Sequence, residues 1–83
     1  MGKYKELAWY ERDKAGEKNL LVMAKAEAVK KLSTLISEAF TNDDLEAIPL
    51  YLETIEQQLQ AMLKLVHEIR EIIEKKRGEN DGK

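Results

Sequence analysis

The chain has 83 residues, of which 36% are charged and 43% hydrophobic, and its formal net charge is −2. It contains no Cys and a single His, which excludes disulfides, thiolate metal sites and His-rich metal sites. One Pro and four Gly are too few for an all-β protein, and the apolar fraction is too high for a disordered chain. A chain this short forms one domain with a small core, so oligomerisation is the expected source of further stability.

The first half of the chain predicts a helix over about residues 4–40. Within residues 20–40 the apolar side chains recur at helical spacing and form a stripe wider than a strict heptad seam. Residues 11–19 carry no large apolar side chain, and Gly16 lies near their middle. This stretch is either a solvated part of one long helix or a break near Gly16. We favour the continuous helix, because a single Gly costs only about 1 kcal/mol there.

Three of the five aromatic residues, Tyr4, Trp9 and Tyr10, lie close to the N-terminus. Tyr and Trp are enriched among the residues that dominate the binding energy of protein interfaces. With Leu7 they form a candidate patch for a protein partner. The alternative is that these side chains pack on the end of a helical bundle.

The second half carries the clearest pattern, a seam of apolar residues whose spacing alternates between three and four. A pattern sustained for four repeats is typical of a coiled coil. We expect a turn at residues 41–44, a helix over about 44–77 with a kink or a restart at Pro49, and a disordered tail over 78–83 after the stop signal of Gly78. The seam consists of Leu45, Ile48, Leu52, Ile55, Leu59, Met62, Val66, Ile69 and Ile73.

A hairpin folded at this turn pairs residues whose numbers sum to roughly 84, so the polar residues 11–19 face residues 65–73. A polar run cannot cover the apolar side chains there, and each Leu or Ile left in water forfeits about 1.5–3 kcal/mol. The predicted fold is therefore all-α: a single domain over residues 1–77, folded as an antiparallel helical hairpin with heptad packing that dimerises into a four-helix bundle. The expected oligomer interface consists of Leu59, Met62, Leu65, Val66, Ile69, Ile72 and Ile73.

Two Glu-x-x-Glu pairs, Glu53 with Glu56 and Glu68 with Glu71, are the main candidates for chemistry. Carboxylates three residues apart share a helix face, and two pairs on facing helices can hold Mg²⁺. All-α nucleotide pyrophosphohydrolases have a loosely similar pattern, but their pairs come from different helices, whereas both pairs here lie on one predicted helix. We expect a solvated acidic face with no metal, cofactor or catalytic residue, and keep an enzyme of that kind as the alternative.

His67 lies away from the apolar seam, and only Glu71 joins it at a spacing of four residues. We therefore expect His67 to be an exposed polar residue rather than a base or a ligand.

The charge is divided unevenly: residues 1–41 carry eight basic and six acidic side chains, and residues 42–83 carry six and ten. Halves of opposite net charge suit an antiparallel hairpin or two chains lying head to tail. Short basic clusters occur at residues 30–31 and 75–77, but a nucleic-acid-binding protein normally has a strong basic excess on one face. We do not expect nucleic acid as a partner, and keep a nucleic-acid accessory protein as a further alternative.

The longest apolar run, residues 20–24, is far shorter than the about 20 residues that cross a bilayer. The first residues contain no apolar segment of the kind that a signal peptide needs, so we expect a cytoplasmic protein without a membrane partner. The function that fits best is a homo-oligomeric helical protein–protein interaction module. It would act as an adaptor, inhibitor or assembly factor, of the size and shape found among phage and plasmid accessory proteins. The expected partners are a second copy of the chain and an unidentified protein.

Overall fold

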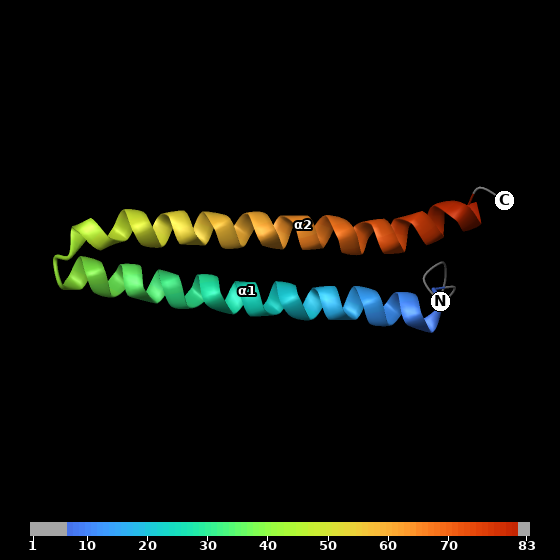
Figure 1. Ribbon diagram of the computed structural model, residues 1–83, viewed down its shortest axis with the longest axis horizontal. Coiled ribbons are helices and arrows are strands. Elements are labelled where there is room, and N and C mark those ends of the chain that lie inside the picture. Colours follow the sequence, from blue (N-terminus) through green and yellow to red (C-terminus); the bar gives the residue numbers. More distant parts are fainter. Residues whose placement is uncertain (1–6, 82–83) are drawn as a thin grey trace.

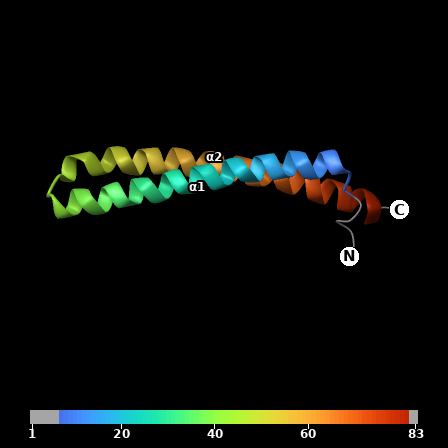
Figure 2. The same ribbon diagram turned by 90° about the horizontal axis from the view of Figure 1, so that it is seen from below.

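The computed structural model describes residues 7–81, with side chains described as far as Glu74. Two long helices, α1 (Trp9–Thr41) and α2 (Ile48–Asp81), are joined by the short 3-10 helix η2 (Leu45–Ala47). They lie side by side and antiparallel, with the turn at one end of the molecule and both termini at the other (Figure 1). Seen after a quarter turn, the two helices cross along their length (Figure 2). The all-α hairpin predicted from the sequence is confirmed.

Helix α1 runs without interruption through Gly16. Its first turn is held by Glu11, whose side-chain Oε1 accepts a hydrogen bond from the backbone N–H of Ala8 at 3.0 Å. That N–H has no partner within the helix, and a carboxylate also favours the positive end of the helix dipole. Residues 11–19 are therefore part of one continuous helix in the structure, with no break near Gly16.

The end of α1 forms a Schellman motif. The backbone N–H of Asp44 donates to the carbonyl of Ala39 at 2.8 Å, and that of Asp43 donates to the carbonyl of Phe40 at 3.3 Å. Asp43 has a φ of 59°. The Schellman motif requires this left-handed conformation at the residue that follows the C-cap, and Gly adopts it most easily. The chain therefore reverses direction at a backbone-capped helix end rather than at a side-chain cap of the second helix.

The helix restarts beside Pro49. The sequence predicted a kink or a restart there, and α2 begins at Ile48, after η2, so Pro49 lies in the first turn of the new helix. A first-turn N–H has no partner within the helix, so the missing N–H of Pro costs little there.

Helix α2 continues past Gly78 as far as Asp81, whereas the sequence predicted a disordered tail over residues 78–83. The last two residues, 82–83, and the residues before Leu7, where the first predicted helix was expected to begin, lie outside the described residues.

The hairpin is long and thin, with extents of 60 × 18 × 18 Å and a radius of gyration of 18.2 Å. A compact domain of this length has a radius of gyration of about 12 Å. Among the described side chains, Ala39 is the only one that is buried. Two helices side by side can shield only one face of each other, so this hairpin has almost no interior of its own.

Candidate protein-interaction surfaces

The side of α1 that faces α2 is of mixed polarity. Its half-buried residues recur every three or four positions, as expected for one face of a helix. They are apolar toward the turn, but three of those toward the open end of the hairpin are charged. The half-buried residues of α1 are Glu11, Ala15, Lys18, Val22, Lys25, Ala28, Val29, Leu32 and Ile36.

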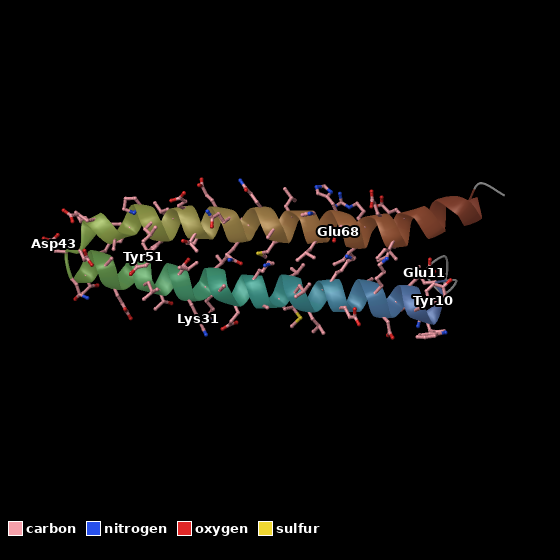
Figure 3. The ribbon with its side chains drawn as sticks, in the orientation of Figure 1. Tyr10, Glu11, Lys31, Asp43, Tyr51 and Glu68 are labelled. Atoms are coloured by element: carbon pink, nitrogen blue, oxygen red, sulfur yellow. The ribbon has the colours of Figure 1, made fainter. Side chains whose placement is uncertain are left out.

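The side of α2 that faces α1 is mixed as well. Tyr51, near the turn, and Glu68, toward the open end, both lie on it, and Figure 3 labels both. Between them the half-buried residues include polar Thr54 and Gln58. Polar side chains in the contact between α1 and α2 bury less apolar surface than Leu or Ile would, so this contact by itself is weakly stabilising.

An ion pair links α1 to α2. Lys18 Nζ donates to Glu68 Oε1 at 2.9 Å, and the two side chains are 25% and 34% exposed. The hydrogen bond from Lys18 is the largest cause that lowers the pKa of the Glu68 carboxyl below its ordinary value, and the charges of Lys18, Lys64 and Lys14 act in the same direction. The pair fixes how residues of the predicted polar stretch 11–19 face residues 65–73.

The apolar seam predicted on the second helix is split lengthwise by this arrangement. Five of its residues are half-buried: Ile48, Ile55, Met62, Ile69 and Ile73. The other four are exposed: Leu45, Leu52, Leu59 and Val66. Because residues seven apart lie on one line along a helix, these four form a continuous exposed row. The centre of the seam therefore points between α1 and solvent rather than directly at α1.

Leu63 extends this row, since it follows Leu59 by one turn and is 57% exposed. We call Leu45, Leu52, Leu59, Leu63 and Val66 the outer stripe. Its part on α2, from Leu52 to Val66, covers 15 residues, about 21 Å at the rise of an α-helix, and Leu45 on η2 precedes it. Single exposed apolar residues are ordinary on a protein surface, whereas a contiguous row is not, and the outer stripe is therefore a candidate interaction site.

An open groove adjoins the end of the outer stripe nearest the open end of the hairpin. Its floor includes Val66, Ile69 and Ile73, and Asn19 of α1 lines it from the opposite helix. Arg70 and Glu74 also line it and form an exposed ion pair of 4.0 Å between Nε and Oε2. The groove is therefore an apolar depression with charged side chains at its rim.

The residues of the oligomer interface predicted from the sequence fall into two groups. Leu59 and Val66 belong to the outer stripe and are exposed. The remaining five are half-buried on or near the side of α2 that faces α1: Met62, Leu65, Ile69, Ile72 and Ile73. Leu63 and Leu52 were not in the predicted set. Leu63 lies one turn after Leu59, and Leu52 lies seven residues before it. This helical spacing in the sequence would have placed both residues beside Leu59.

The aromatic patch predicted near the N-terminus is partly described. Trp9 is 74% exposed and Tyr10 is also exposed, while Leu7 is half-buried. The Trp9 and Tyr10 rings meet edge to face, with centroids 5.9 Å apart and an interplanar angle of 86°. Figure 3 places Tyr10 at the open end of the hairpin. Tyr4 lies outside the described residues.

The candidates for chemistry do not converge on one another. Glu53, Glu56 and Glu71 are exposed along α2, Glu68 is paired with Lys18, and His67 is exposed. Within the described residues no three His, Asp or Glu side chains are grouped closely enough to hold a metal ion. Within the described residues the hairpin therefore exposes a row of apolar side chains and gathers no cluster of acidic and histidine side chains.

No described helix combines the length and the apolar character needed to cross a membrane. No protein-family model matches the chain, and no curated protein and no solved structure matches it.

Proposed function

We propose that this chain is a small homo-oligomeric helical interaction module that acts as an adaptor, inhibitor or assembly factor by presenting helix surfaces to other proteins. The observation that carries this proposal is the outer stripe. Five large apolar side chains, Leu45 on η2 and the other four on α2, remain exposed in the hairpin, while Ala39 is the only buried side chain among the described residues. Covering this row with a second chain removes apolar surface from water, which the hairpin alone does not do.

The amount of exposed surface supports the same proposal. The chain has an accessible surface of 6432 Å², whereas a compact monomer of 9.6 kDa exposes about 5,100 Å². The excess of roughly 1,300 Å² is larger than the ~800 Å² that each partner buries in an interface of standard size. A dimer of hairpins, with α2 of each copy at its centre and heptad packing between the helices, brings the exposed area toward the ordinary range.

The aromatic pair at the open end is a second surface in this proposal. Trp9 and Tyr10 are exposed on α1, whereas self-association is proposed through α2, so the proposal leaves them for a second partner. Exposed Trp and Tyr are the side chains that most often anchor a partner protein. The module would thus use one surface to assemble and another to bind its target.

Light scattering and sedimentation of the purified chain test the proposal. The wild-type chain should be a dimer or larger at micromolar concentration, and Leu59→Asp should weaken assembly, because a charge would enter an apolar contact without a counter-ion. Gln57→Asp is the matched control, since it places the same charge on an exposed position of α2 outside the stripe. A wild-type chain that remains monomeric at high concentration would show that the outer stripe does not serve self-association.

A further inference from the structure

Charged residues flank the outer stripe in a symmetric order. Glu56 lies seven residues before Leu63 and Arg70 lies seven residues after it, so all three share one line along α2. All three side chains are exposed. The apolar residues beside this line are also balanced, with Leu59 and Val66 at similar distances on either side of Leu63, and Leu52 and Ile73 further out.

We propose that the occupant of the outer stripe is α2 of a second copy, packed antiparallel about a two-fold axis that passes beside Leu63. This proposal rests on the self-association proposed above and adds its geometry. About such an axis, Leu63 meets Leu63 of the second copy, and Leu59 meets Val66 of the second copy. Each Glu56 meets Arg70 of the other chain, so two opposite-charge pairs form at once.

The groove beside Val66 can receive side chains of the second copy. Its apolar floor and its Arg70 rim would receive two side chains from the second copy that lie one turn apart on α2. Leu52 would reach Ile73 and the floor, and Glu56 would reach Arg70. An apolar residue followed by an acidic one therefore meets an apolar depression beside a basic residue. The order of apolar and charged side chains is therefore complementary to itself, with Glu56 of the second copy sharing Arg70 with Glu74.

The environment of Glu56 favours a cation from outside its own helix. The residues three and four positions away, Leu52, Glu53, Leu59 and Gln60, include no basic side chain, and Glu53 repels it. A parallel dimer would place Glu56 beside Glu56 and Arg70 beside Arg70, and these like charges oppose association. The antiparallel order removes both conflicts, so the charges choose the orientation while the apolar stripe supplies the affinity.

Single cysteines test this geometry directly, because the chain contains no Cys of its own. Leu63→Cys should form a disulfide-linked dimer on mild oxidation, since the two sulfurs meet at the axis. Leu52→Cys should not, because the two copies of residue 52 lie about 33 Å apart in the antiparallel order. The double variant Leu52→Cys with Ile73→Cys should link again. Gln57→Cys, exposed and outside the stripe, is the control for random collision.

Charge reversal tests the same geometry without a covalent cross-link. Glu56→Arg or Arg70→Glu alone should weaken the dimer about tenfold or more in Kd, and the double reversal should restore it to within about threefold of wild type. Circular dichroism at high concentration checks that each variant keeps its helices. A wild-type chain that is monomeric overturns both this inference and the proposed function. A dimer in which Leu63→Cys does not link, Leu52→Cys links with itself, or the double reversal fails to restore affinity overturns this inference alone.

Discussion

Lys18 and Glu68 are fifty residues apart in sequence, yet their side chains form a 2.9 Å ion pair between α1 and α2. The pair lies where the polar stretch of α1 meets the apolar end of α2. Here the hairpin is held partly by charge, while toward the turn its two helices meet through mostly apolar side chains. The open end of the hairpin is therefore the part most sensitive to acid.

Replacing Glu68 with Gln should lower the melting temperature at neutral pH and flatten its dependence on acid. The pKa of Glu68 is lowered in the folded chain, chiefly by the hydrogen bond from Lys18, so the ionised form stabilises the fold. This contribution is complete above the ordinary range of a Glu carboxyl and is lost as the pH falls through the lowered value. Thermal melts of both chains from pH 7 to pH 3 measure it. Equal pH dependence in the two chains would show that the pair contributes nothing.

Asp43→Gly should raise the stability of the hairpin by about 0.5–1 kcal/mol. Asp43 has a φ of 59° at the left-handed position of the Schellman motif, and Gly adopts that conformation without the clash of a Cβ. Asp43→Ala serves as the opposite control, because Ala tolerates the left-handed region less well than Asp. Denaturant unfolding should rank the three chains Gly above Asp above Ala, and any other order would contradict this account of the turn.

Gly16→Ala should stabilise α1 by about 1 kcal/mol, since Ala is the better helix former in an exposed helix interior. No heavy atom outside the local backbone lies within 4 Å of the position that the new Cβ would occupy, so the substitution meets no steric conflict. A gain of this size corresponds to a rise of about 4–8 °C in melting temperature. If the melting temperature falls instead, the chain would need flexibility at residue 16, as in the broken-helix alternative.

The sequence pattern predicted the two helices and the turn because the spacing of apolar residues is a local property of the chain. The rotation of α2 about its own axis is not determined by this spacing. The exposed row of Leu52, Leu59 and Val66 and the half-buried row of Tyr51, Leu65 and Ile72 lie about 100° apart around the helix, on either side of the half-buried row that includes Ile55 and Met62. Periodicity alone does not say which of the two outer rows turns toward α1. That choice depends on the opposing surface, where Lys18 selects Glu68.

Adding millimolar Mg²⁺ should leave the melting temperature within about 1 °C of its metal-free value. Ligands stabilise a fold in proportion to their binding to the native state, and the Glu pairs on α2 are exposed or engaged with Lys18 rather than gathered around one point. Glu53→Gln provides the control. A rise with Mg²⁺ in the wild-type chain that disappears in Glu53→Gln would favour the enzyme alternative instead.

The melting temperature should depend on the concentration of the chain. Ala39 is the only buried side chain among the described residues, so we expect the stability of the fold to come largely from contacts between copies. When association and folding are coupled, a tenfold increase in concentration adds about 1.4 kcal/mol per dimer. Shared between two chains of this length, that gain corresponds to a rise of about 3–5 °C. Circular dichroism melts across a hundredfold range of concentration measure the slope. Leu59→Asp should melt at a lower temperature at every concentration, whereas Gln57→Asp should follow the wild-type line. A wild-type melting temperature that is constant across the range, with a cooperative transition, would mean that the hairpin is stable alone and that its outer stripe serves only a different partner.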